Sequence, residues 1–161
     1  LLLYGIGLAD LLAEWKRLFD PKTLYLPYLL VTIMLTETAI YNVFIYLDIV
    51  NQFEGLSYLG YLRFLVGPFL FLITVNAFTP EKEADTKTYF IDRLPIFFGL
   101  LAAFVASHFL YEPEYSSGIF LRIAGVLVIA AIGFFRKVKL VYPLFAIWLV
   151  SFLFKANVFA F

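Results

Sequence analysis

The chain has 161 residues, of which 63% are hydrophobic and 15% are charged, and its mean hydropathy is +0.93. A soluble domain is usually about half apolar and about a quarter charged, so this composition, spread along the whole chain, excludes an ordinary soluble domain. The formal net charge is zero and there is no cysteine, which predicts no nucleic-acid partner and excludes disulfides, iron–sulfur clusters and thiol chemistry.

Six apolar segments are long enough, or nearly so, to cross a bilayer as helices, which takes about 20 mostly apolar residues. They show no sustained alternation of apolar and polar residues and are about twice as long as barrel strands, which favours helices over strands. The expected spans are 1–19, 24–47, 56–78, 89–111, 118–135 and 140–161. The connections are short, so we expect a single domain over 1–161: an all-α integral membrane protein with a bundle of about six transmembrane helices.

The distribution of Lys and Arg predicts the orientation, because cytosolic loops carry an excess of both. Nine of the twelve basic residues lie in or beside the first, third and fifth connections: Lys16, Arg17, Lys22, Lys82, Lys87, Arg93, Arg136, Lys137 and Lys139. The second and fourth connections contain acidic residues and no Lys or Arg. This pattern requires an even number of spans, and it places the N and C termini on the non-cytosolic side.

Rows of small residues predict where helices approach each other, because close packing of small side chains drives helix association in lipid. The first span has such a row at four-residue spacing, and so does the fourth. The rows are Gly5, Ala9 and Ala13, then Gly99, Ala103 and Ser107. We expect both faces to pack within the bundle, with self-association as the alternative.

Glu37 is the strongest candidate for a functional residue, because it lies near the midpoint of the second span, where a charge costs roughly 2.5–3.5 kcal/mol. Thr36 precedes it, and Asn42 lies further along the same span. One interpretation is a proton- or cation-binding site. The other is a structural strut, either a hydrogen bond or an ion pair with Arg63, Arg122 or Lys155.

Asp10 and Glu14 are four residues apart in the first span and therefore share a helix face. One interpretation is a carboxylate pair that lines a cytosolic vestibule and attracts cations. The other is an interfacial network, in which Glu14 pairs with Arg17 and Asp10 caps a neighbouring helix. Asp92 is expected near the start of the fourth span, where the positive end of the helix dipole would stabilise its negative charge.

Four basic residues come from four different spans on the predicted outer side: Arg63, His108, Arg122 and Lys155. If they converge, they form a basic pocket for an anionic solute, a lipid headgroup or a quinone-like oxygen. The alternative is that the long side chains reach the interface separately. His108 alone does not make a metal site.

No catalytic motif is visible: there is no HExxH, Walker loop or GxSxG, and no selectivity-filter sequence. We therefore expect no catalytic residue, no metal and no cofactor, and an enzyme is the least favoured class. The first hypothesis is a small ion or solute transport or channel protein. The second is a non-catalytic membrane subunit or sensor that binds a protein or lipid partner, with a homo-oligomer as another possibility.

Residues 4–12, YGIGLADLL, followed by Arg17-Leu18, resemble the opening of a group of small uncharacterised bacterial multi-pass membrane proteins. Tyr89-Phe90, Arg93 and residues 97–101, FFGLL, are similar to the fourth span of that group. The resemblance implies a location in the bacterial inner membrane, and it implies no activity and no functional residue.

Overall fold

The computed structural model describes residues 2–20, 24–50, 57–81, 84–110 and 119–158, with only the backbone for 46–50 and 154–158. Within these ranges the chain is helical and contains no strand. The helices are α1 (Leu2–Leu18), α2 (Leu26–Val50), α3 (Tyr58–Phe78), α4 (Thr86–Ser107), α5 (Ile119–Phe135) and α6 (Val141–Val158), with 3-10 turns η1 (His108–Leu110) and η2 (Val138–Leu140). The prediction of an all-helical chain with six helices is therefore confirmed for the described residues.

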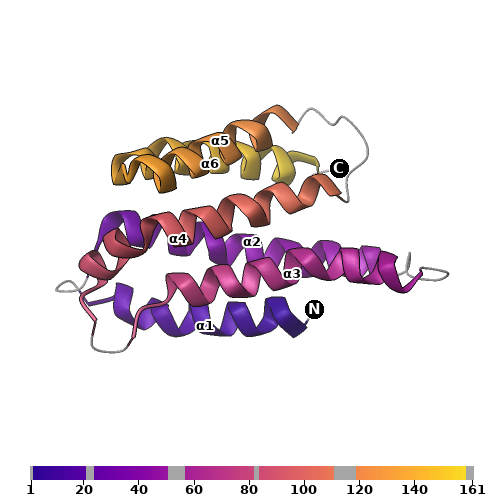
Figure 1. The fold of residues 1–161 in the computed structure, drawn as a ribbon, viewed down its shortest axis with the longest axis horizontal. Helices are drawn as coiled ribbons and strands as arrows, with labels where there is room; N and C mark the ends of the chain where they lie inside the picture. The colour runs from indigo at the N-terminus through magenta and orange to yellow at the C-terminus, as the bar shows by residue number, and fades with distance from the viewer. Residues whose placement is uncertain (1, 21–23, 51–56, 82–83, 111–118, 159–161) are drawn as a thin grey trace.

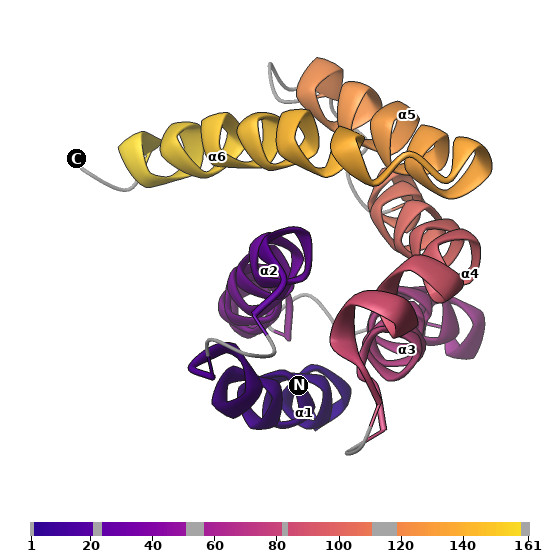
Figure 2. The same cartoon turned by 90° about the vertical axis from the view of Figure 1, so that its left-hand side faces the viewer.

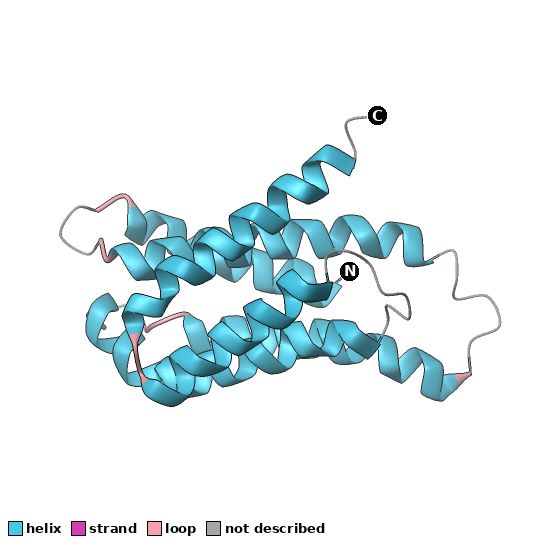
Figure 3. Ribbon diagram, turned by 90° about the horizontal axis from the view of Figure 1, so that it is seen from above, coloured by secondary structure: helices cyan, strands magenta, loops and turns pink. Residues whose placement is uncertain are grey.

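The helices run back and forth, so that α1, α3 and α5 end at one end of the bundle and α2, α4 and α6 end at the other (Figure 1). Seen along the bundle, they pack in a closed cycle in which α1 touches α2 and α3, α3 touches α4, α4 touches α5, α5 touches α6, and α6 returns to α2 (Figure 2). Contact across the cycle, between α2 and α4, is lighter. The far end of α6 diverges from the other helices (Figure 3).

Aromatic rings fill the centre of the packing between α2, α3 and α4. Tyr28 stacks on Phe78 with ring centroids 4.3 Å apart, and the edge of Phe90 meets both rings. Phe97 and Phe98 extend this group along α4. Offset and edge-to-face pairs of this kind contribute about 0.5–1.5 kcal/mol each beyond the area they bury, and they lock the three helices in register.

The outer surface is also apolar. Large hydrophobic side chains are exposed on all six helices, among them Leu12, Phe44, Phe69, Ile96, Leu127 and Leu153. Within the described residues, three helical segments are long and apolar enough to cross a membrane: Leu26–Ile45, Tyr58–Phe78 and Thr86–Leu110. Ile119–Phe135 and Val138–Leu153 are shorter apolar helices. An exterior this apolar is unsuited to water, which fits a protein that associates with a membrane.

The start of the fourth helix differs from the expectation. α4 begins at Thr86 rather than near residue 89, because Asp85 caps it and its carboxylate accepts from the backbone N–H of Thr88 at 2.9 Å. Asp92 is therefore in the second turn and exposed, and the expected role at the positive helix end belongs to Asp85. A three-residue extension of this kind follows from the cap, which satisfies a free N–H of the first turn.

The expected packing of the small-residue rows is wrong for α1. Gly5, Ala9 and Ala13 are exposed, and no atom lies within 4 Å of a Cβ placed on Gly5. In α4, Gly99 and Ala103 are also exposed, whereas Ser107 is buried. The close approaches occur elsewhere: a Cβ on Gly7 meets Phe71 of α3 at 2.8 Å, and one on Gly133 of α5 meets Phe98 of α4 at 3.2 Å.

Candidate functional site

Glu37 lies within the membrane-length part of α2, and its carboxylate is tied to α6. The indole Nε1–H of Trp148 donates to Oε2 of Glu37 at 3.0 Å, and the contact is partly buried. No ion pair of Glu37 is found among the described side chains. Of the expected basic partners, Arg63 and Arg122 engage other groups. The side chain of Lys155 lies outside the described residues, so its pairing with Glu37 stays a prediction.

Thr36 and Asn42, the other two candidates on α2, face different neighbours from Glu37. The hydroxyl of Thr36 accepts from the indole of Trp15 on α1 at 3.2 Å and donates to the carbonyl of Thr32. Asn42 contacts Tyr4 of α1 and His108 of η1. The three candidate residues of α2 are thus distributed around the helix rather than gathered on one surface.

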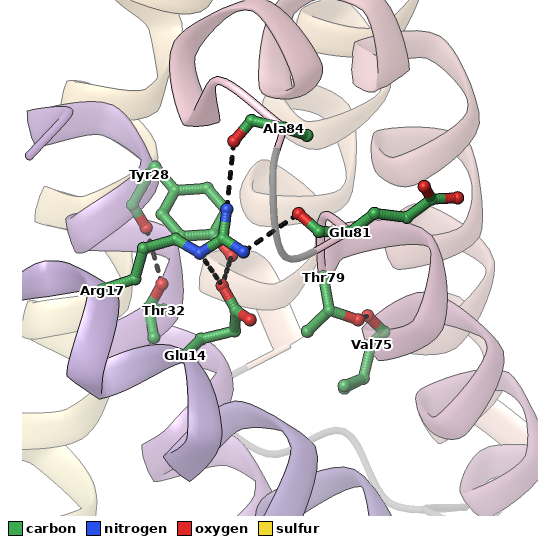
Figure 4. A network of polar contacts seen from close by, with 8 residues as sticks. All are labelled: Glu14, Arg17, Tyr28, Thr32, Val75, Thr79, Glu81 and Ala84. Atoms are coloured by element: carbon green, nitrogen blue, oxygen red, sulfur yellow. Dashed lines mark hydrogen bonds and ion pairs between the residues drawn. The ribbon is translucent and has the colours of Figure 1, made fainter. Parts of the chain in front are cut away.

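Glu14 belongs to a network of polar contacts near the C-terminal end of α1 (Figure 4). It forms an ion pair with Arg17, Nε to Oε2 at 3.4 Å, and its Oε2 accepts from the hydroxyl of Tyr28 at 3.0 Å. The guanidinium of Arg17 also donates to the carbonyls of Glu81 and Ala84. The network therefore contains the expected pair of Glu14 and Arg17. It also joins α1, α2 and the two described ends of the α3–α4 connection.

Asp10 does not join this network. It is half-buried in the middle of α1, and no hydrogen bond or ion pair links it to another described side chain or backbone group. It does not cap a neighbouring helix in the described structure, and no described contact joins it to Glu37. A carboxyl at membrane depth is costly without a partner, which keeps Asp10 a candidate site residue.

Three of the four basic residues predicted on the outer side contact or belong to η1. The guanidinium of Arg63 on α3 donates to the carbonyl oxygen of Leu110, and that of Arg122 on α5 lies over the ring of Phe109, 5.7 Å from its centroid. His108 is the first residue of the same turn. The three residues come from different helices, as the pocket hypothesis requires.

Sequence reasoning missed the aromatic partners of these polar groups. Trp148 holds Glu37, Trp15 holds Thr36, and Tyr4 holds Asn42. The available signal was the donor capacity of Trp and Tyr, which usually find an acceptor when they are buried. The described residues contain no group of three or more His, Cys, Asp or Glu that would hold a metal ion.

No protein-family model matches the chain, and the searches of curated proteins and of solved structures also gave no match. The resemblance to the group of bacterial membrane proteins therefore stays a prediction from residues 4–12 and the stretches that follow.

Proposed function

We propose that the chain is a six-span protein of the cell inner (plasma) membrane that moves a small ion or solute, with Glu37 as the group that binds a proton or cation. The observation that carries this proposal is the environment of the Glu37 carboxyl. It lies in a membrane-length helix, it receives one hydrogen bond from a neutral indole, and no positive charge accompanies it among the described side chains.

The physical reason is the cost of an isolated charge in lipid. A hydrogen bond from Trp148 orients the carboxyl but leaves its negative charge in place. A carboxylate at membrane depth needs a counter-charge, and a bound proton or cation supplies one where no Lys or Arg does. Asp10 is a second half-buried carboxyl on the predicted route, on the neighbouring helix α1.

The test is ion flux in liposomes containing the purified full chain, with separate gradients of protons, Na⁺ and K⁺. Glu37→Gln keeps an oxygen that accepts from Trp148 and removes the charge. We expect it to lower the flux on the order of tenfold or more, because transported cations and protons use the charge.

Trp148→Phe is the matched control, because it removes the donor and leaves the carboxyl. We expect it to keep most of the flux and to lower the stability of the bundle by about 1–3 kcal/mol, the cost of losing a hydrogen bond to a charged group. The proposal fails if Glu37→Gln leaves the flux unchanged, or if the wild-type chain moves none of the three ions. Equal loss of stability and flux in both variants would instead assign Glu37 a structural role.

A second candidate is a non-catalytic subunit or sensor that binds a membrane-protein partner, a lipid or a second copy. The row of Gly5, Ala9 and Ala13 favours it, because its side chains are small enough for close helix contact and all three residues are exposed in the described structure. Absence of flux together with a stably co-purified partner would favour this function over transport.

A further inference from the structure

Polar side chains join three helical elements at the end of the bundle where α4 passes into η1. The hydroxyl of Tyr4 on α1 donates to Oδ1 of Asn42 on α2 at 3.2 Å. Nε2 of His108 lies 3.2 Å from the same oxygen. Tyr4 and Asn42 are buried and His108 is half-buried, so this contact is largely removed from lipid and water.

The orientation of the Asn42 amide is set by a third contact. One end of the amide lies 2.8 Å from the backbone carbonyl oxygen of Thr38. A carbonyl only accepts, so this end must be the NH₂ group. The oxygen end therefore faces Tyr4 and His108, and exchanging the two ends would place two acceptors against each other.

Both nitrogens of the His108 ring then face oxygen atoms that accept. Nε2 faces Oδ1 of Asn42, and Nδ1 lies 3.1 Å from the backbone carbonyl oxygen of Phe104. A neutral imidazole has one N–H, so in either tautomer one bare nitrogen would face an acceptor. With a proton on each nitrogen, both contacts are hydrogen bonds. The geometry points to His108 as a proton-binding site, in which Asn42 and the Phe104 carbonyl hold the imidazole in its doubly protonated form.

The described charged groups that contact η1 do not supply this preference. Arg63 of α3 donates to the carbonyl of Leu110, two residues further on, and Arg122 of α5 lies over Phe109. Tyr4 is the titratable group on the α1 side. Both arginines oppose a positive imidazole, so among the described groups the two acceptors are the ones that favour the second proton. Residues 111–118, which contain Glu112 and Glu114, lie outside the described structure.

The second proton ties α1, α2 and η1 together. Its loss replaces one hydrogen bond by a contact between a nitrogen lone pair and an oxygen. The junction is therefore tighter in acid and looser in alkali, and imidazole is the side chain whose ordinary titration falls in the physiological range. This site does not involve Glu37, so it stands or falls independently of the proposed transport function.

The test uses nitrogen NMR of the full chain in detergent micelles with ¹⁵N-labelled histidine. The chain has one histidine, so every imidazole signal belongs to His108. At about pH 7.5, only roughly a tenth of ordinary histidine is doubly protonated. We expect both ring nitrogens of the wild-type protein to carry protons at that pH. A wild-type spectrum with one protonated and one bare nitrogen overturns the proposal without any variant.

A pair of asparagine variants tests the cause. Asn42→Leu removes the acceptor, and we expect the ratio of doubly to singly protonated imidazole to fall on the order of tenfold, as for loss of a hydrogen bond to a charged group. Asn76→Leu is the control, because Asn76 makes the same bond to the carbonyl four residues earlier but is exposed on α3. An equal fall in both variants, or none in Asn42→Leu, contradicts the assignment.

Discussion

At Gly7 the absence of a side chain lets α1 lie directly against α3. A Cβ at this position would be 2.8 Å from Cε1 of Phe71 and 3.6 Å from Cγ2 of Val75. The ring of Phe71 is fully buried and is itself held between Tyr4 and Phe104, so it has no free space into which to turn. We predict that Gly7→Ala destabilises the bundle by about 1–3 kcal/mol, the usual cost of overpacking.

Gly5 offers the control on the same helix, because a Cβ there has no neighbour within 4 Å. Alanine is a better helix former than glycine by about 1 kcal/mol, so Gly5→Ala should be neutral or slightly stabilising. Unfolding of both variants in detergent, followed by circular dichroism, measures the difference. Similar losses in the two variants would mean that α1 does not pack on α3 as described.

The sequence contained Gly7, but its role was not predictable from spacing. The pattern rule selected Gly5, Ala9 and Ala13, which are exposed, rather than Gly7, which is buried. Lipid-facing and bundle-facing side chains are equally apolar in this chain, so hydropathy does not distinguish the two faces of α1. The hydrogen bond between Trp148 and Glu37 was not predictable either, because hydropathy does not indicate which helix faces meet and the two residues are 111 positions apart.

At the scale of elements, the start of α4 depends on one exposed carboxylate. The hydroxyl and the backbone N–H of Thr88 both donate to Oδ2 of Asp85, and these bonds lower the pKa of that carboxyl below 3.8, with a smaller contribution from Lys87. A lowered pKa means that the folded state favours the charged form. Its contribution to stability is present above pH 3.8 and is lost as the pH falls towards the lower pKa of the folded state.

We predict that Asp85→Ala destabilises the protein at neutral pH and that the difference from wild type shrinks as the pH falls below 3.8. The alanine variant lacks the cap, and it lacks the negative charge that interacts favourably with the positive end of the helix dipole. Thermal unfolding in detergent at several pH values measures the difference. A deficit that stays constant or grows in acid would contradict the role given to Asp85.

The existence of the helices was more predictable than their ends. Long apolar runs separated by Pro and by charged residues predicted six helices, and six are present in the described residues. The observed ends of α2 and α4 differ from the predicted ends by two or more residues, because capping and the final turns depend on local hydrogen bonds such as those of Asp85. Polar contacts between helices, including the junction of Tyr4, Asn42 and His108, depend on packing that local patterns do not encode.

At the scale of the whole molecule, helix length and the distribution of charge bear on how many of the six helices cross the bilayer. Three segments are membrane-length, whereas α1 and α5 have 17 residues each, the lower end of the usual range of about 17–25. The back-and-forth arrangement puts the ends of α1, α3 and α5 together (Figure 1), and Lys16, Arg17, Lys87, Arg136 and Lys137 lie in or beside these ends. Such clustering of Lys and Arg is the signature of a cytosolic face, and it favours six crossings.

Six crossings and three make opposite predictions for two lysines. If all six helices cross, Lys87 near the start of α4 and Lys137 after α5 lie on the same, cytosolic side. If only α2, α3 and α4 cross, the membrane separates Lys87 from Lys137. The chain has no cysteine, so single variants Lys87→Cys, Lys137→Cys and Tyr58→Cys each present one reactive thiol. All three native side chains are exposed.

We predict that a membrane-impermeant maleimide labels Tyr58→Cys in intact cells and labels the two lysine variants only after the cells are opened. Labelling of Lys137→Cys alone among the lysine variants would establish three crossings, and labelling of both with protection of Tyr58→Cys would invert the orientation.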